Sequence, residues 1–194
     1  MQNTWFTADP HLGHEGKNSG GIIKLAKRPF SSIDEMDTVL IDNINKKVMP
    51  DDIFYCLGDF SMKDHNPYLE RINCKNKILV PGNHDHTKRI KHATLWHNFE
   101  NLKHNGDRII KLKMDDTIII LCHYAMRTWN RSHHGALHLY GHSHGNLPGD
   151  SQSCDVGVDC WGFEPVTLPE IMKRMATHPK RAELDHHKVK EMEG

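Results

Sequence analysis

Side chains that could bind a metal ion recur along the first three quarters of the sequence, in short runs beside glycine or proline. The candidates are Asp9, His11, Asp59, Asn83, His123, His142 and His144. They offer nitrogen and oxygen donors without a thiolate. Such a set suits divalent ions such as Mn, Fe, Zn or Ni, and argues against copper(I) or an iron–sulfur cluster. Seven ligands exceed one tetrahedral site, and they fit two ions that share one carboxylate.

The spacing and charge of these residues indicate the chemistry. Asp9 and His11 are two residues apart, as are His142 and His144, so on an extended segment each pair faces one side. Two divalent ions carry four positive charges, and two aspartates with a bridging hydroxide carry three negative ones. The remaining positive charge favours an anionic substrate. Two ions can polarise a phosphoryl group and supply hydroxide near neutral pH.

The elements that must position these residues follow from hydrophobic patterning. Strands are expected over 4–8, 53–57, 77–80, 108–114, 117–121, 136–140 and 153–158. Helices are expected over 22–27, 33–48, 67–73 and 169–177, and a mixture of short helix and loop over 87–102. Five of the strands end directly before candidate ligands, and the carboxyl ends of strands in α/β sheets are where sites are built. The pattern predicts a layered α/β domain.

Composition limits the classes of protein to consider. The chain has 194 residues, 37% of them hydrophobic, with 25 Lys plus Arg, 25 Asp plus Glu and 17 His. We expect a single domain over 1–177 and a polar tail over 178–194. The zero net charge argues against extended nucleic acid as a partner. The apolar run 118–122 is far shorter than the roughly 20 residues that a membrane span needs.

Two features of the sequence, the first residues and the cysteines, indicate the cellular compartment of the protein. Residues 1–9 lack a basic stretch followed by an apolar one, so we expect no secretory signal. The five cysteines form no C-x-x-C pair, which favours reduced thiols. We therefore expect a cytoplasmic protein that does not bind a membrane.

Five motifs occur in order along the chain. They are Asp9-Pro10-His11, Gly58-Asp59, Gly82-Asn83-His84-Asp85, His123 and Gly141-His142-Ser143-His144. In this order they resemble the motifs of the calcineurin-like metallophosphoesterase family, above all its small bacterial and phage members. The resemblance extends to Phe6-Thr7-Ala8, to His14, to Arg28-Pro29-Phe30 and to residues 155–159. It implies a four-layer α/β/β/α sandwich with two bound divalent ions.

The resemblance also implies a role for each matching residue. Asp9, His11 and His144 would bind one metal ion, and Asn83, His123 and His142 the other. Asp59 would bridge the two ions. His84 would protonate the leaving oxygen, and Asp85 could orient its imidazole. His14, His86 and Arg127 flank the motifs and are candidates for binding substrate, Arg127 because a guanidinium suits a phosphate oxygen.

The predicted function is hydrolysis of phosphodiester bonds in nucleotide-like or small substrates, by attack of a hydroxide that bridges two metal ions. Mn²⁺ is the ion we expect to serve best in vitro. Activity on phosphomonoesters, including phosphoproteins, is the alternative, because the motifs are shared. A non-catalytic protein-binding module of the same fold is the alternative from another class. The physiological metal, the substrate and the oligomeric state stay open.

Overall fold

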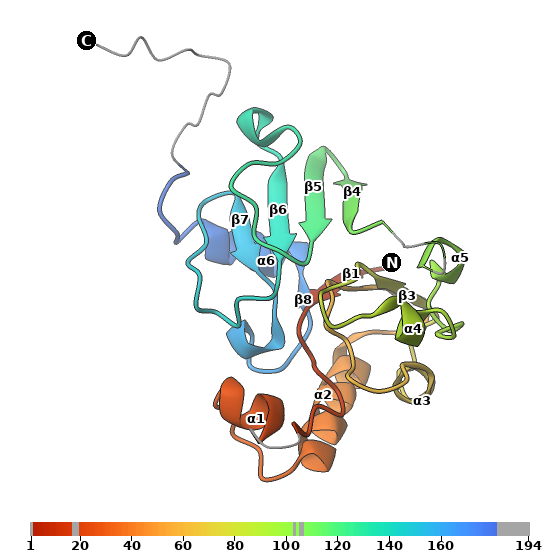
Figure 1. The fold of residues 1–194 in the computed structure, drawn as a ribbon. Coiled ribbons are helices and arrows are strands. Elements are labelled where there is room, and N and C mark those ends of the chain that lie inside the picture. Colours follow the sequence, from red (N-terminus) through yellow and green to blue (C-terminus); the bar gives the residue numbers. More distant parts are fainter. Residues whose placement is uncertain (1, 17–19, 103, 105–106, 182–194) are drawn as a thin grey trace, which may run out of the picture.

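Two four-stranded sheets form the framework of the protein in this computed structural model, which describes residues 2–16, 20–102, 104 and 107–181 (Figure 1). The first sheet has the order β3-β2-β1-β8, and the second has the order β4-β5-β6-β7. The strands of the first are β1 (Thr4–Thr7), β2 (Ile53–Cys56), β3 (Asn76–Leu79) and β8 (Val166–Thr167). Those of the second are β4 (Ile109–Met114), β5 (Thr117–Cys122), β6 (Leu137–Tyr140) and β7 (Ser153–Asp155).

Strand direction brings the candidate ligands to one region. In the first sheet β1, β2 and β3 are parallel and β8 is antiparallel to β1. In the second sheet β5, β6 and β7 are parallel, and β4 pairs antiparallel with β5 as the predicted hairpin. A parallel bridge between Ala8 and Gly157 joins the loop after β1 to the loop after β7. The carboxyl ends of six strands therefore open toward the same place.

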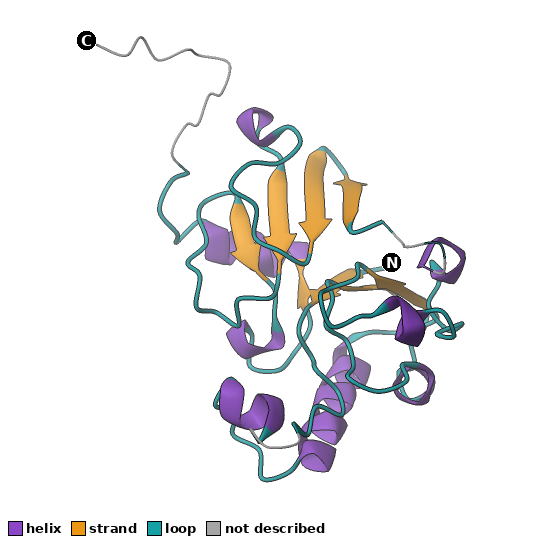
Figure 2. Cartoon of the chain, in the orientation of Figure 1, coloured by secondary structure: helices purple, strands orange, loops and turns teal. Residues whose placement is uncertain are grey.

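Helices flank the sheets without forming a full layer on both sides (Figure 2). They are α1 (Gly21–Leu25), α2 (Ile33–Lys47), α3 (Asn66–Glu70), α4 (Thr87–Ile90), α5 (Phe99–Leu102) and α6 (Leu168–Met175). Two 3₁₀ turns lie at Ser132–His134 and Val158–Cys160. The predicted elements are present with shifts at their ends. Strand β8 was missed, because two residues give too short a pattern to recognise.

Two apolar clusters explain the layering. The first packs α2 residues such as Leu40 against Phe54 of β2 and Leu79 of β3. The second lies between the sheets, where Phe6 and Leu57 meet Leu121, and Ile171 of α6 closes the end. The α/β class is thereby confirmed.

The structure does not confirm the predicted four-layer sandwich. A small cluster covers the other face of the second sheet, where Trp129 packs on Ile120 and Ala136. Its indole donates a hydrogen bond to the Ala136 carbonyl at 2.8 Å. On this face of the second sheet, a loop with one 3₁₀ turn therefore stands where the predicted sandwich would have its outer helical layer.

Helix α2 shows how local sequence sets one side of the site. Ser32 caps its first turn by accepting a hydrogen bond from the Glu35 amide. Its apolar positions face the first sheet, but Asp37 is also buried there. Both Asp37 carboxylate oxygens accept the Gly13 amide, at 3.0 and 3.1 Å. This helix therefore anchors the loop that carries His11 and His14.

The first residues of the predicted tail lie against the body of the protein. Arg181 forms an ion pair with Asp150 at 2.8 Å, and its guanidinium stacks on Trp129, 3.9 Å from the ring centroid. Residues 182–194 of the predicted tail lie outside the described residues. Within the described part of the chain, no helix is long and apolar enough to cross a membrane.

Candidate metal centre

All seven predicted ligands lie in the loops that follow five strands. Asp9 and His11 follow β1, Asp59 follows β2, and Asn83 follows β3. His123 follows β5, and His142 with His144 follows β6. The first sheet thus supplies four of the ligands and the second sheet three. Their function as ligands remains a prediction, but the structure brings them together.

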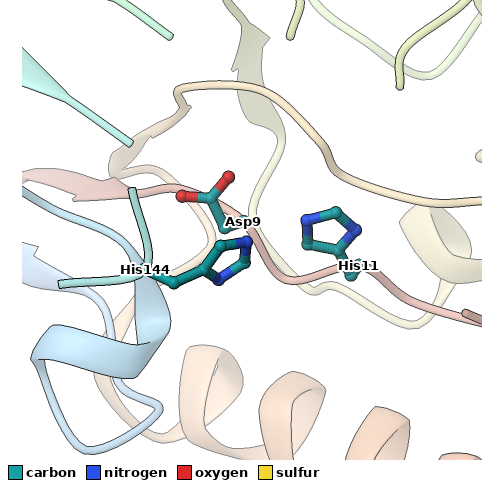
Figure 3. Close-up of side chains that lie close together, drawn as sticks. All are labelled: Asp9, His11 and His144. Carbon is teal, nitrogen blue, oxygen red and sulfur yellow. The ribbon is translucent and has the colours of Figure 1, made fainter. Parts of the chain in front are cut away.

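The ligands form two groups with the partition that the family resemblance implies. One group contains Asp9, His11 and His144, and its three ligand atoms all lie within 4.8 Å of one another. Figure 3 shows these side chains gathered around a common point, with His144 approaching from the opposite sheet. The other group contains Asp59, His123 and His142 at the same spacing. Asn83 joins the second group, since its Oδ1 lies 3.0 Å from His123 Nε2.

Asp59 belongs to the second group and also lies close to the first. Its Oδ2 is 3.6 Å from Nε2 of His11 and 3.4 Å from Nε2 of His123. Its Oδ1 accepts the backbone amide of His84 at 2.8 Å. One carboxylate oxygen therefore faces a residue of each group while the other is held in place. This is the position that a bridging ligand needs.

Five of the seven ligands share an unusual backbone conformation. Their φ angles are positive: Asp9 57°, His11 53°, Asp59 53°, His142 67° and His144 48°. Asp and His enter this left-handed region more readily than most residues, but it still costs of order 1–3 kcal/mol each. Such strain collects at functional sites, and here it turns successive side chains toward one point.

Buried polar atoms in the first group lack hydrogen-bond partners. Asp9 and His11 are 0% and 3% exposed. Asp9 Oδ1 and both ring nitrogens of His11 have no partner. Burying such atoms without compensation is costly. A divalent cation would satisfy Asp9 Oδ1 and one nitrogen of His11 together, so the residues present fit the predicted metal.

Glycines make room for this arrangement. A Cβ on Gly58 would meet the Gly82 backbone nitrogen at 2.5 Å and His123 Nδ1 at 2.7 Å. A Cβ on Gly141 would meet Asp9 Oδ2 at 2.6 Å. These contacts are too short for any side chain, so the loops pack against the ligands through bare backbone.

The electrostatics of the protein without metal favour cation binding. Burial lowers the pKa of His11 to about 2, which keeps its imidazole neutral and able to donate a lone pair. Burial raises the pKa of Asp9 to about 7. Burial also acts to raise the pKa of Asp59, but the hydrogen bond and charge of His123, with the His84 amide and the charge of His11, lower the value to about 2. A positive charge beside these carboxylates is therefore favourable.

Two residues that the sequence analysis left without a role support the ligands. Asp159 Oδ2 accepts Nδ1–H of His144 at 2.7 Å, which directs Nε2 toward the site. Arg28 is 4% exposed and forms a two-pronged pair with the same carboxylate, with both contacts at 2.8 Å. Its other donors reach the carbonyls of Asp9 and Pro10, at 2.7 and 2.9 Å. Arg28 therefore ties the first ligand loop to the last.

Asp155 secures the loop of His142 and His144. Its Oδ2 accepts the Ser143 hydroxyl at 2.6 Å and the Gly145 amide at 3.1 Å. Asp155 is the last residue of β7 and Asp159 follows the strand, which is the sixth strand end at the site. The resemblance over 155–159 was the signal that could have assigned them a role.

His84 and His14 line a cavity that adjoins the first group. The cavity has a volume of about 360 Å³, and His11, His144 and Asn146 also line it. Ile22, Leu25, Ala26 and Lys27 form the opposite wall. The side chain of His84 is 37% exposed, with Nε2 3.9 Å from Asp59 Oδ2. Its ring therefore faces both the ligands and the open space.

The structure gives Asp85 a different role from the predicted one. Its carboxylate is fully buried and accepts the amides of Asp59, Phe60 and Gly82 at 2.7, 3.1 and 2.9 Å. In this structure it positions the Asp59 loop, and it does not orient the His84 imidazole as predicted. The backbone turns away after His84, so adjacent residues face opposite surroundings.

Two predicted substrate-binding residues lie apart from this cavity. His86 is exposed at the start of α4. Arg127 lines a separate hollow with Tyr140 and Arg181. Tyr124 was not predicted, but its ring lies 4.8 Å from His142 and 5.1 Å from His123, measured between ring centroids. It is 43% exposed and therefore borders the second group.

The chain is similar in sequence to several known proteins. The uncharacterized protein MJ1445 of Methanocaldococcus jannaschii is 30% identical over 179 residues, which cover 89% of this chain and 91% of that protein. The gene 66 protein of Mycobacterium phage L5 is 26% identical over 190 residues, covering 84% and 89%. No protein-family model matches the chain.

Solved structures of similar proteins include one of the same fold. A protein of unknown function, AQ665 from Aquifex aeolicus, is 24% identical with a TM-score of 0.63, covering 90% of this chain and 100% of that one. The phosphoesterase YfcE of E. coli is 16% identical with a TM-score of 0.38, covering 80% and 78%.

The fold and the site can now be compared with the family resemblance seen in the sequence. Two facing sheets carry the five ordered motifs at their strand ends, which is the arrangement that the resemblance to the calcineurin-like metallophosphoesterases predicts. The chain belongs to the family of the protein MJ1445 of Methanocaldococcus jannaschii.

Proposed function

We propose that the protein is a metal-dependent phosphoester hydrolase with two divalent ions, and that phosphodiesters are its preferred substrates. The observation that carries the proposal is the pair of ligand groups on either side of Asp59. Asp9, His11 and His144 would hold one ion, Asn83, His123 and His142 the other, and Asp59 both. The ions would polarise the phosphoryl group and lower the pKa of water, and Mn²⁺ is the ion we expect to serve in vitro.

In this proposal His84 would act as the general acid. Its backbone amide is tied to Asp59 Oδ1, and its carbonyl accepts Arg89 at 2.8 Å, so the residue is held at both ends. The ring stays partly exposed and lines the cavity. A proton on Nε2 would therefore lie beside a phosphoryl group at Asp59, ready for the leaving oxygen.

The shape of the cavity supports a diester. The space continues from His84 and His14 to α1, where Leu25 is 64% exposed and Lys27 adds a positive charge. An ester substituent beyond phosphorus would fit against this wall, and a nucleotide is one candidate. Monoesterase activity is the alternative within the class. A non-catalytic binding module would need none of the seven ligands, and all are present.

A rate comparison tests the function. Mn²⁺-loaded protein would be assayed on bis-(p-nitrophenyl) phosphate and on p-nitrophenyl phosphate. We expect faster turnover of the diester, and a loss of about 10²–10⁴-fold in His84→Ala with its bound metal unchanged. Faster turnover of the monoester would establish the alternative. No turnover of either substrate by protein that binds no metal would exclude the enzyme.

A further inference from the structure

A chain of buried polar contacts leads from Trp96 to the loop of Asp59. Trp96 is 1% exposed, and its indole Nε1–H donates to His65 Nδ1 at 3.1 Å. His65 is fully buried, and its Nε2 lies 3.5 Å from Oδ1 of Asp85. The same Oδ1 accepts the Phe60 amide, and Oδ2 accepts the amides of Asp59 and Gly82. None of the motif resemblances includes His65 or Trp96.

The contacts define the tautomer of His65. An indole nitrogen can only donate, so Nδ1 of His65 must accept and carries no proton. In the neutral ring the proton is then on Nε2, the atom that faces Asp85. His65 Nε2 is buried and makes no hydrogen bond of standard geometry, and it lies 3.5 Å from Asp85 Oδ1. The imidazole therefore has a donor within ion-pair distance of a buried carboxylate that already accepts three backbone amides.

Asp85 joins the loops after β2 and β3. It accepts Asp59 and Phe60 from the first loop and Gly82 from the second. Asp59 holds a left-handed φ of 53° and is the ligand between the two metal groups. Small rotations of Asp85 would move Asp59 and the Asn83–His84 segment relative to each other.

We propose that His65 is a positioning residue for the metal centre, which it serves through the polar contact of Nε2–H with Asp85 while Trp96 holds its ring in that tautomer. This inference rests on the proposed metal centre only for its functional consequence. The mechanical part, which is that His65 restrains the amides of Asp59, Phe60 and Gly82 through Asp85, applies to the protein without metal as well.

A matched pair of variants separates this role from simple packing. Gln places an amide nitrogen near the position of His Nε2, so His65→Gln keeps the donor toward Asp85 and loses the acceptor for Trp96. Asn places its amide oxygen near Nδ1, so His65→Asn keeps the acceptor and loses the donor. Each variant removes one buried hydrogen-bonding partner. Packing alone therefore predicts equal effects, whereas positioning predicts unequal ones.

The first readout is amide hydrogen exchange of the metal-free protein, followed at Asp59, Phe60 and Gly82. We expect exchange at these three amides to be at least tenfold faster in His65→Asn than in His65→Gln, with equal exchange in β5 of the second sheet. Equal rates in the two variants would overturn the proposal. If His65→Asn does not fold, Trp96→Phe takes its place. We then expect amide exchange at the same three positions to be about threefold faster than in the wild type. An unchanged exchange rate would contradict the proposal.

The second readout is Mn²⁺ affinity, measured by calorimetry. Changes around metal ligands commonly cost about 10–100-fold in affinity. We expect His65→Asn to lose at least tenfold and His65→Gln less than threefold. Equal losses would overturn the proposal. If the wild-type protein bound no Mn²⁺, the proposed function would fail, and the exchange experiment would still decide whether His65 restrains the loop.

Discussion

At the scale of single residues, the site is held by partners that lie far away in the sequence. Asp159 is 131 residues from Arg28, yet the two carry a paired contact that also fixes His144. Motif spacing identifies ligands because they follow strand ends. Motif spacing does not identify the pairing of Asp159 with Arg28, because no feature of the nearby sequence indicates a partner so far along the chain.

Removal of the Asp159 charge should weaken the first metal group. Asn at this position cannot accept from Arg28 and His144 as strongly, so His144 loses its fixed orientation. We expect Asp159→Asn to lower Mn²⁺ affinity about 10–100-fold by calorimetry. Asp150→Asn is the control, because it breaks the comparable pair with Arg181 outside the site. Equal affinities of the two variants would contradict this role.

Metal affinity should rise with pH. In the metal-free protein burial raises the pKa of Asp9 to about 7, so its carboxyl is partly protonated near neutrality. A metal ion competes with that proton, and the competition weakens as pH rises. We expect tighter Mn²⁺ binding at pH 8 than at pH 6, with proton release measurable by calorimetry in buffers of different ionisation enthalpy. Mn²⁺ affinity that is the same at pH 6 and pH 8 would refute the assignment of Asp9 as a metal ligand.

At the scale of elements, the loops after the strands approach one another through glycine. A Cβ on Gly82 would meet Asp59 and, at 2.9 Å, Cε1 of His123. The sequence marks Gly82 as part of a motif, but its packing between two ligands emerges only when β3 and β5 are placed in facing sheets.

Gly82→Ala should therefore damage the site selectively. We expect the overpacking to cost roughly 1–3 kcal/mol in stability and to lower Mn²⁺ affinity at least tenfold. Gly135→Ala is the comparison, since nothing lies within 4 Å of its Cβ and only its φ of 81° is unfavourable. That variant should lose stability and keep its affinity. Chemical denaturation and calorimetry measure both, and intact affinity in Gly82→Ala would be inconsistent with the packing described.

At the scale of the whole molecule, the candidate centre connects the two sheets. Each ligand group draws on both, since His144 joins Asp9 and His11, and His123 joins Asp59. The strand-end pattern was enough to predict the α/β class and to predict that these residues lie close together. The loop around Trp129 was not predictable in the same way, because irregular segments have no periodicity to signal which face they cover.

Metal removal should consequently lower the stability of the whole fold. At a Mn²⁺ concentration one hundred times Kd, a single site adds about 2.7 kcal/mol. For a domain of this size that corresponds to roughly 5–10 °C in Tm. We expect this shift between Mn²⁺ and chelator in differential scanning calorimetry, and we expect it to shrink in His123→Ala. The same Tm under both conditions would argue against a cation joining the sheets.

The number of Mn²⁺ ions bound per chain tests the central claim most directly. Equilibrium dialysis of the wild-type protein, with the metal quantified by mass spectrometry, should find two ions per chain. Asp59→Ala should lose affinity for both, because its carboxylate faces both ligand groups. One ion or none in the wild type, or an Asp59→Ala variant that still binds two with unchanged affinity, would contradict the dinuclear centre from which the proposed hydrolase follows.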